Sequence, residues 1–421
     1  MLTRRLFLKT GGVALFAVGV GGGPGFLTRA ALAATGTGST SSRKRKVLVT
    51  IFQRGAMDGL AAVPPIAAAE LKSLRPRLAT SGARSEGEAA LLDLETGFGF
   101  HPAFEPLLPL WKDKRLAIVH AVGSPDPTRS HFDAQDFMET GTPGRKGTPD
   151  GWLNRAVGLM GHDGSPFRAV AMTAALPRSL YGDEPAIAVT NLADFKVQLP
   201  GADRTAAAAG QGFETLYEQA SQGLLRETGG ETFRAIHMLS AAEIERYRPA
   251  EGVEYPQTPL GNALRQIALL VKSDVGLEIA FAESGGWDTH VQQAGTFARQ
   301  ARDLAQAIHA FWTDLGSYQD QVVLTTMTEF GRTVRENGSG GTDHGHGSCL
   351  FVLGNPVDGG KVHGVFPKGL EPGALYEGRD LPVTTDFRAV FCELAGKHLG
   401  IKDDARLFPG WTGKRLPLLK A

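Results

Sequence analysis

The sequence is poor in cysteine, with only Cys349 and Cys392 among its 421 residues. Two cysteines cannot build the dense disulfide framework that holds many small secreted proteins together, so the fold must depend on a hydrophobic core. Both lie in apolar stretches, where the expected role is that of a small buried side chain. A single bridge between them is compatible with an oxidising compartment.

The sequence also offers no good candidate for a membrane span and no basic patch interleaved with aromatic residues. The apolar stretch at residues 13–20 is too short and too rich in glycine to be a good membrane span, so we expect no stable span in the mature protein. Basic and acidic residues are balanced at 44 each, and no basic segment interleaved with aromatic residues occurs. This composition argues against a nucleic-acid partner.

The N-terminus carries an export address instead. Residues 3–9 read T-R-R-L-F-L-K, which is a near-complete twin-arginine signal, and the small-residue site A-L-A follows at 31–33. Such signals are recognised by a receptor and direct the export of a folded chain, so we expect the twin-arginine translocase as a partner during export. We predict a signal peptide over residues 1–33 and a periplasmic or extracellular mature protein. An N-terminal anchor that is not cleaved is the alternative.

Short apolar segments alternate with helical patterns after a linker at residues 34–46. The predicted strands cover residues 46–52, 115–122, 167–173, 186–190, 276–282, 321–327 and 349–354. The predicted helices cover residues 102–112, 132–140, 151–160, 232–247, 259–272, 291–315 and 386–399. This alternation predicts an α/β fold with a doubly wound, mostly parallel sheet and helices on both faces. We expect one domain over residues 47–421, with a helical cap or insertion around 202–250.

Two glycine-rich segments that follow predicted strands contain the residue types that bind metals. G-W-D-T-H, at 286–290, contributes Asp288 and His290; G-T-D-H-G-H-G, at 341–347, contributes Asp343, His344 and His346. Borderline divalent metals prefer Asp and neutral His, and open α/β sheets bind ligands at the carboxyl ends of their strands. We therefore predict a divalent-metal site, with zinc, manganese or calcium as the ion. For Asp288, capping of the following helix is the alternative.

Asp58 and His363 are further candidate ligands. Asp58 follows the first predicted strand, where a carboxylate is well placed to hold a metal or orient a substrate. An Asp-Gly pair is also a strong turn signal by itself, so a simple turn is the alternative at this position. His363 follows a Gly-Gly turn, and a structural role is the alternative for this lone histidine.

Ser130 and Arg332 are the candidate catalytic residues. Ser130 precedes the predicted helix at 132–140, where free N–H groups and the helix dipole favour an anion and where a hydroxyl can act as a nucleophile. A serine that only caps the helix is the alternative, although charged neighbours such as His131 are more than a cap requires. Arg332 can pair with Glu329, or its planar guanidinium can clamp an oxyanion.

These motifs resemble a known bacterial family. S-H-F-D-A-Q at 130–135, T-E-F-G-R-T at 328–333 and E-N-G-S-G-G-T-D-H-G-H-G-S at 336–348 look like the "domain of unknown function 1501" proteins. The resemblance spans essentially the whole mature chain. It implies a place in the alkaline-phosphatase-like superfamily, whose active members hold one or two divalent metals by Asp and His and attack with a nucleophile near a helix N-terminus.

Carried over residue by residue, the resemblance implies a specific set of roles. Asp58 corresponds to the family's early aspartate ligand, and Ser130 corresponds to its nucleophile. Asp288 corresponds to a later aspartate ligand. Asp343 and His344 correspond to the Asp-His ligand pair, and His363 corresponds to the final histidine. The chain has no C-x-P-x-R signature, which argues against a formylglycine sulfatase.

The expected function is that of an exported, metal-dependent hydrolase of phosphate or sulfate esters. The metal would polarise the ester, and Arg332 or Arg129 would stabilise the developing oxyanion. One alternative is a catalytically inactive relative that binds an anionic ligand, a glycan or a partner protein in the cell envelope. A structural envelope protein without a metal is a third interpretation.

Overall fold

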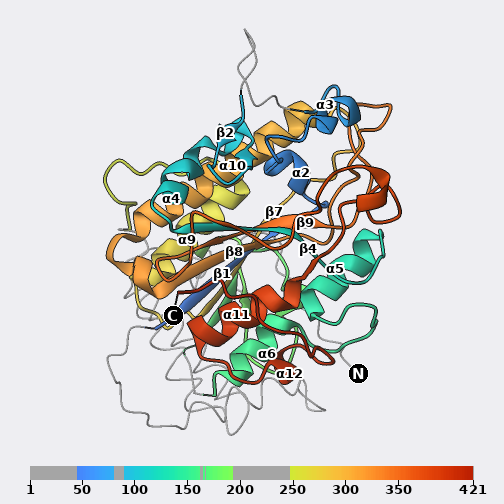
Figure 1. The fold of residues 1–421 in the computed structure, drawn as a ribbon. Helices are drawn as coiled ribbons and strands as arrows, with labels where there is room; N and C mark the ends of the chain where they lie inside the picture. Colours follow the sequence, from blue (N-terminus) through green and yellow to red (C-terminus); the bar gives the residue numbers. More distant parts are fainter. Residues whose placement is uncertain (1–44, 80–89, 162–164, 166, 193–246, 421) are drawn as a thin grey trace, which may run out of the picture.

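The computed structural model describes residues 45–79, 90–161, 165, 167–192 and 247–420 (Figure 1). The predicted signal peptide, almost all of the linker, and the cap or insertion around 202–250 up to residue 246 lie outside these described residues. So does the predicted helix at 232–247, apart from its last residue. Within the described part of the chain, no helix combines the length and the apolar character that crossing a membrane requires.

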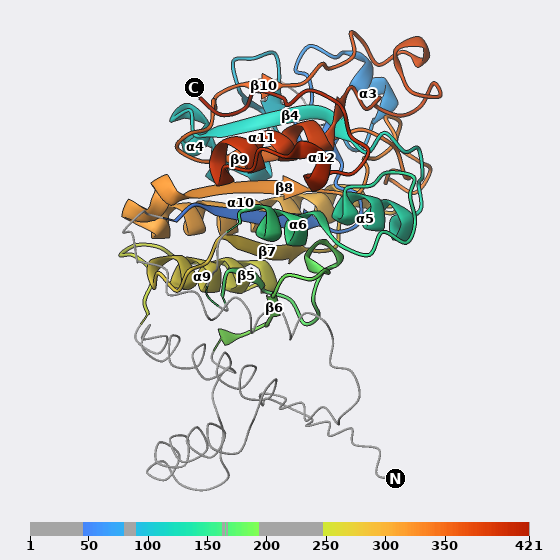
Figure 2. The same ribbon diagram turned by 90° about the horizontal axis from the view of Figure 1, so that it is seen from below.

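A nine-stranded sheet forms the centre of the fold, in the order β10-β4-β9-β8-β1-β7-β5-β6, with β11 pairing beside β4. Figure 2 shows these strands in succession from β10 and β4 to β6. Their bounds are β1 Val47–Gln53, β4 Leu116–Gly123, β5 Ala169–Ala171, β6 Ile187–Ala188, β7 Ile279–Ser284, β8 Val322–Met327, β9 Ser348–Leu353, β10 Val362–His363 and β11 Thr385–Asp386. β1 pairs in parallel with β7 and β8, whereas β9 runs antiparallel to β4 and β8.

The strands are apolar on both faces because helices cover both sides of the sheet. Along β1, Val49 and Ile51 pack into the hydrophobic cluster on one face, and Leu48 and Phe52 pack into the cluster on the other. Successive side chains of a strand point to opposite faces, so a strand buried on both sides has to be apolar throughout. This explains why the sequence of β1 reads as a continuous hydrophobic run.

Two groups of helices supply these covers (Figures 1 and 2). The first cluster receives residues from η1 Pro102–Leu107, α4 Leu108–Lys112, α9 Pro259–Lys272 and α10 Gln293–Leu315. The second receives residues from α5 His131–Thr140, α6 Trp152–Leu159, α11 Phe387–Leu399 and α12 Asp404–Leu407. The predicted fold class, α/β with a doubly wound and mostly parallel sheet covered on both faces, is confirmed. The remaining short elements are α2 Gly59–Ala62, α3 Glu70–Leu74, β2 Leu92–Asp93, β3 Gly99–Phe100, η2 Arg178–Leu180, η4 Gly316–Gln321 and η5 Pro372–Ala374.

Local sequence explains where several helices begin and break. α9 begins with Pro259 at its first position, and the Thr258 side chain accepts a hydrogen bond from the backbone N–H of Gly261. The helix predicted over residues 102–112 is instead split into the 3₁₀ segment η1 and the short helix α4. Pro106 and Pro109 lie within this stretch and lack the N–H groups that a continuous α-helix would use.

The segments that follow β1, β7 and β8 leave from the same edge of the sheet, because these three strands are adjacent and parallel. Their backbones approach one another closely where glycine occurs. A Cβ atom on Gly341 would lie 2.3 Å from the carbonyl of His290, and one on Gly345 would lie 2.4 Å from the carbonyl carbon of Arg332. Gly55, at φ +113°, approaches the backbone nitrogen of Asp288 in the same way. These glycines therefore serve close packing between loops.

Candidate metal centre

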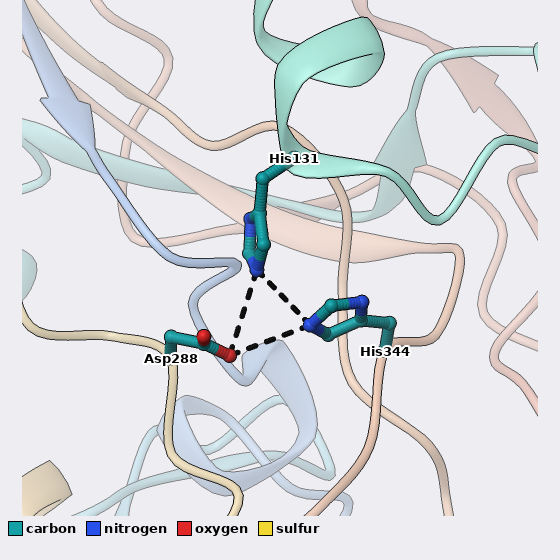
Figure 3. A group of neighbouring side chains, drawn as sticks. All are labelled: His131, Asp288 and His344. Carbon is teal, nitrogen blue, oxygen red and sulfur yellow. Dashed lines mark hydrogen bonds and ion pairs between the residues drawn. The ribbon is translucent and has the colours of Figure 1, made fainter.

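Three side chains from distant parts of the chain bring one donor atom each to a common point (Figure 3). They are His131 at the start of α5, Asp288 after β7 and His344 after β8, and we call them the donor triad. Nε2 of His131 lies 3.0 Å from Nε2 of His344. Oδ1 of Asp288 lies 3.5 Å from Nε2 of His131 and 3.4 Å from Nε2 of His344.

The separations within the donor triad fit a single metal ion. Donors that bind one tetrahedral zinc ion at about 2.0–2.1 Å lie about 3.3–3.4 Å from one another. The three measured separations, 3.0, 3.4 and 3.5 Å, bracket that value. Among the described residues, no group of three or more His, Cys, Asp or Glu side chains converges in this way elsewhere in the fold.

His290 places a third imidazole beside the donor triad. Its Nε2 lies 2.9 Å from Nε2 of His344 and 3.1 Å from Oδ1 of Asp288. Asp288 and His290 reach the same point although they are two residues apart, because the segment after β7 is neither helical nor paired in the sheet. His290 is therefore a candidate fourth ligand.

An acceptor holds the other ring nitrogen of each of these imidazoles. Nδ1 of His131 lies 2.8 Å from a carboxylate oxygen of Glu329. Nδ1 of His290 lies 3.0 Å from a carboxylate oxygen of Asp343. Nδ1 of His344 lies 2.8 Å from the backbone carbonyl oxygen of Arg129. Ionised carboxylates and carbonyls only accept, so each neutral ring carries its proton on Nδ1 and turns the lone pair of Nε2 inward. Nε2 of His344 then faces Nε2 of His131 at 3.0 Å and Nε2 of His290 at 2.9 Å, with an acceptor on each side of both contacts. Acceptors that face one another at such distances repel, so the arrangement favours a cation between them, either a metal ion or an added proton.

The electrostatic surroundings keep Asp288 ionised. Burial raises the pKa of Asp288, but the Arg332 guanidinium and the neighbouring histidines outweigh this effect and leave the pKa below its usual range. The hydrogen bond to Glu329 raises the pKa of His131, whereas desolvation lowers the pKa of His344. The centre thus combines one carboxylate with imidazoles that differ in their affinity for protons.

Arg332 is a buried guanidinium beside the donor triad. Its NH1 donates to Oδ1 of Asp288 over 2.9 Å, and its Nε donates to Oγ1 of Thr342 over 3.3 Å. Its NH2 group is buried and has no hydrogen-bond partner. A buried N–H donor without a partner is energetically costly, so the NH2 group is a candidate donor to an anion or a water molecule. Arg332 pairs with Asp288 and not with the nearby Glu329.

Ser130 is the N-cap of α5, at the helix start where the sequence places it. Its Oγ accepts a hydrogen bond from the backbone N–H of Asp133 at 3.5 Å, and the residue is exposed. The helix ends at Gly141, which adopts a positive φ of 68°. In these contacts Ser130 is a cap, placed one residue before a member of the donor triad.

Asp58 does not belong to the donor triad. It is buried, and its Oδ1 caps α2 by accepting from the backbone N–H of Ala61. Its Oδ2 accepts from NH1 of Arg75 at 2.8 Å and from Nε2 of Gln293 at 2.6 Å. Both oxygens are thus engaged in a cap and a buried ion pair, which agrees with the turn alternative.

Three other predicted ligands also lie outside the donor triad. The Asp343 carboxylate holds Nδ1 of His290, so its role is to orient a candidate ligand. The His346 ring is buried against Tyr376, with ring centroids 4.7 Å apart. His363 lies in β10, which is separated from β1 and β7 by β4, β9 and β8, and this position in the sheet explains why it does not reach the centre.

His131 is the member of the donor triad that sequence analysis does not identify as a ligand. The sequence presents it only as a charged neighbour of Ser130. One signal was available, because a histidine directly after an N-cap lies at the helix end where an anion is expected. Whether that helix end meets the loops after β7 and β8 depends on tertiary packing, which the local sequence does not reveal.

The comparison with protein families agrees with the motifs. A family model described as "Protein of unknown function (DUF1501)" matches residues 45–409. No curated protein matches the chain.

Several solved structures share a distant likeness with the chain. The C-terminal periplasmic domain of EcEptC from Escherichia coli, in complex with Zn, has a TM-score of 0.37 and 9% identity over 75% of this chain and 74% of that one. A protein in the alkaline phosphatase superfamily from Vibrio parahaemolyticus scores 0.33, with 10% identity over 81% and 71%. The PsFucS1 sulfatase from Pseudoalteromonas sp. scores 0.36, with 11% identity over 90% and 72%. At such low scores the likeness carries no argument about function.

Proposed function

The chain belongs to the DUF1501 family, and we propose that it is an exported, metal-dependent hydrolase of phosphate or sulfate esters. The observation that supports the proposal most directly is a contact between the candidate cation site and Arg332, a guanidinium that could bind an anion. Oδ1 of Asp288 belongs to the donor triad and also accepts from Arg332, whose NH2 group has no partner. A cation and a fixed hydrogen-bond donor that lie side by side can together stabilise the negative charge on the oxygens of a phosphate or sulfate ester.

The donor set favours zinc over calcium. Imidazole nitrogens provide two members of the donor triad, and His290 offers a third, whereas calcium prefers oxygen ligands. When bound, a divalent ion supplies a Lewis acid that polarises an ester oxygen.

The other roles follow from chemistry and position. The NH2 group of Arg332 donates to a non-bridging oxygen of the ester, because it stays charged and has no competing acceptor. The backbone N–H groups at the start of α5 provide further donors for the same anion. Ser130, at this helix end, is the proposed nucleophile toward phosphorus or sulfur.

A second candidate is an inactive relative that binds an anionic ligand, a glycan or a partner protein in the cell envelope. The contacts of Ser130 favour it, since the hydroxyl already accepts a hydrogen bond from Asp133 as a cap. The same cation site and Arg332 would then bind an anion without cleaving it.

Export by the twin-arginine translocase is part of the proposal. It is supported by the arginine pair Arg4 and Arg5 and by the A-L-A site at 31–33. Replacing both arginines by lysine should retain the precursor in the cytoplasm. Normal export of that variant would contradict this route.

The test of the enzymatic proposal has two stages. Purified protein is analysed for bound metals and is then assayed against a panel of phosphate and sulfate esters. A Ser130→Gly variant removes the hydroxyl at a cost of only a few tenths of a kcal/mol to the cap, so its activity isolates the nucleophile. We expect stoichiometric zinc or manganese, ester hydrolysis by the parent and none by the variant. A metal-loaded protein that binds esters without hydrolysing any would favour the inactive relative.

A further inference from the structure

A polar stripe runs along one side of α5. His131, Gln135 and Glu139 follow one another at intervals of four residues, so they lie one above the other on the same face of the helix. The stripe meets two groups at the carboxyl edge of the sheet, Glu329 after β8 and Arg54 after β1. His131 at the top of this stripe is a member of the donor triad.

Gln135 bridges these two groups with its two amide atoms. Its Nε2 donates to Oε1 of Glu329 over 2.8 Å, and its Oε1 accepts from NH1 of Arg54 over 3.3 Å. An amide offers a donor and an acceptor at once, which suits a position between a carboxylate and a guanidinium. Arg54 is itself held by Glu139 at 2.6 Å and by Glu283 at 2.7 Å.

Glu329 is fully buried and depends on these contacts. The same oxygen, Oε1, also accepts from the backbone N–H of Gly55 at 2.9 Å and lies 2.8 Å from Nδ1 of His131. A buried carboxylate remains charged only if it is hydrogen-bonded and paired. Three donors on one oxygen fix its position, and that position fixes the ring of His131.

We propose that Gln135, backed by Arg54, is a positioning residue for the metal centre. It holds Glu329 in place, Glu329 holds Nδ1 of His131, and His131 turns Nε2 toward the ion. The inference rests on the metal binding in the proposed function, but it concerns a residue that touches neither ion nor ester. The direct partner of the histidine is Glu329, and removing such a partner typically weakens metal affinity by about 10–100-fold. Gln135 acts one contact further out, through Glu329.

The test compares zinc affinities of the purified protein, measured by competition with a chromophoric chelator. Gln135→Leu should bind zinc more weakly than the parent, by up to about 10-fold, because Gln135 acts through Glu329. The matched control is Asp136→Asn on the same helix, because Asp136 pairs with Arg178 at 2.9 Å and lies outside the stripe. This control should bind zinc like the parent. Circular dichroism and thermal melting of the metal-free proteins identify variants that fail to fold.

A second variant keeps the inference testable if Gln135→Leu does not fold. Gln135→Glu can still accept from Arg54 but turns a carboxylate toward Glu329, so zinc affinity should fall while the contact with Arg54 persists. The visible spectrum of the cobalt-loaded protein should change in the Gln135 variants and not in Asp136→Asn, which separates positioning from a general loss of stability.

The outcomes distinguish this inference from the proposed function. If the parent binds zinc and a folded Gln135 variant binds it equally well, the positioning role is wrong while the proposed function stands. An equal loss of affinity in Asp136→Asn would also overturn it, because the effect would then be a general one of α5. If the parent binds neither zinc nor manganese, the proposed function and this inference both fail.

Discussion

Nδ1 of His131 lies 2.8 Å from Oε1 of Glu329, although 198 positions separate these residues in the sequence. Glu329 is fully buried in the segment after β8, and His131 is the first residue of α5. The contact joins the helix to the carboxyl edge of the sheet at the residue whose Nε2 belongs to the donor triad. The contribution of α5 to the candidate metal centre therefore depends on a carboxylate from the segment after β8.

His131→Ala should abolish metal binding. It removes a ligand and not merely an outer partner, so the affinity should fall by more than about 100-fold. The matched control is His363→Ala, because His363 lies in β10 and contacts the backbone carbonyl of Asp358. Atomic emission analysis of the purified proteins should find metal in the parent and the control only. Metal at parental level in His131→Ala would contradict the assignment.

Asp58→Ala should destabilise the fold and leave the metal in place. The change strips the buried Arg75 of its charge partner, which costs about 3–5 kcal/mol of unfolding free energy. The Asp58 carboxylate is engaged by Arg75 and Gln293, so the folded fraction should keep its metal. Urea denaturation gives the stability, and metal analysis follows on the same sample. A stable, metal-free Asp58→Ala would show that this residue is a ligand after all.

Gly341→Ala should disturb the centre, whereas Gly338→Ala in the same loop should not. A Cβ at Gly341 would meet the backbone of His290 at 2.3 Å, and one at Gly338 has no atom within 4 Å. The clash should cost about 1–3 kcal/mol and weaken metal binding by moving His290. The control should stay within about 0.5 kcal/mol of the parent. Thermal melting with and without zinc checks both, and equal behaviour of the two variants would contradict the close-packing account.

Stability should fall as the pH drops from about 6.5 toward 4. Burial lowers the pKa of His120 from 6.5 to about 4, and its ring bonds the carbonyl of Val63 and the N–H of Ala121. Between these pH values the unfolded chain binds more protons than the folded one, so the unfolding free energy rises with pH. The full effect of this histidine is about 3 kcal/mol.

The variant His120→Gln tests this assignment. An amide retains a donor and an acceptor but has no proton that titrates in this range. Urea denaturation at pH 7 and pH 4.5 should show a smaller loss of stability in the variant than in the parent. An identical loss would mean that other groups, such as the buried His398, account for the pH dependence.

Arg332→Lys should separate catalysis from metal binding. Lysine keeps a positive charge near Asp288. It lacks the planar guanidinium, in which NH1 donates to Asp288 while NH2 has no hydrogen-bond partner. We expect kcat for an ester substrate to fall by about 10²–10³-fold with unchanged metal content. The control is Arg129→Lys, since the Arg129 guanidinium is occupied by Asp380 and Glu377. A larger loss in the control would transfer the anion-binding role to Arg129.

Much of the fold is predictable from the sequence because the strands are continuous apolar runs. The run at 46–52 corresponds to β1 Val47–Gln53, and the helix predicted at 259–272 has the bounds of α9. The antiparallel direction of β9 is not predictable in this way, because a strand buried on both faces has the same pattern in either direction. Strand direction is decided by the connections that precede and follow it.

The centre is only partly predictable, for a related reason. Asp288 and His344 stand in conspicuous motifs, and the structure brings them together. Asp58 is equally conspicuous, but its carboxylate forms an ion pair with Arg75. No local sequence pattern predicts that partner. His131 reaches the centre through contacts of α5 with Glu329, which lies far along the chain. Residue type identifies candidate ligands, whereas long-range partners select among them.

The donor triad draws its members from α5, from the segment after β7 and from the loop after β8. No contiguous piece of the chain can therefore bind the ion in the same way, so an ion bound there would stabilise the folded state and not the unfolded chain. At a free-metal concentration of 100 times Kd, such binding adds about 2.7 kcal/mol to the unfolding free energy. The amount of metal that a chelator captures during heating would then measure the fraction of unfolded protein. This measurement does not require a known substrate.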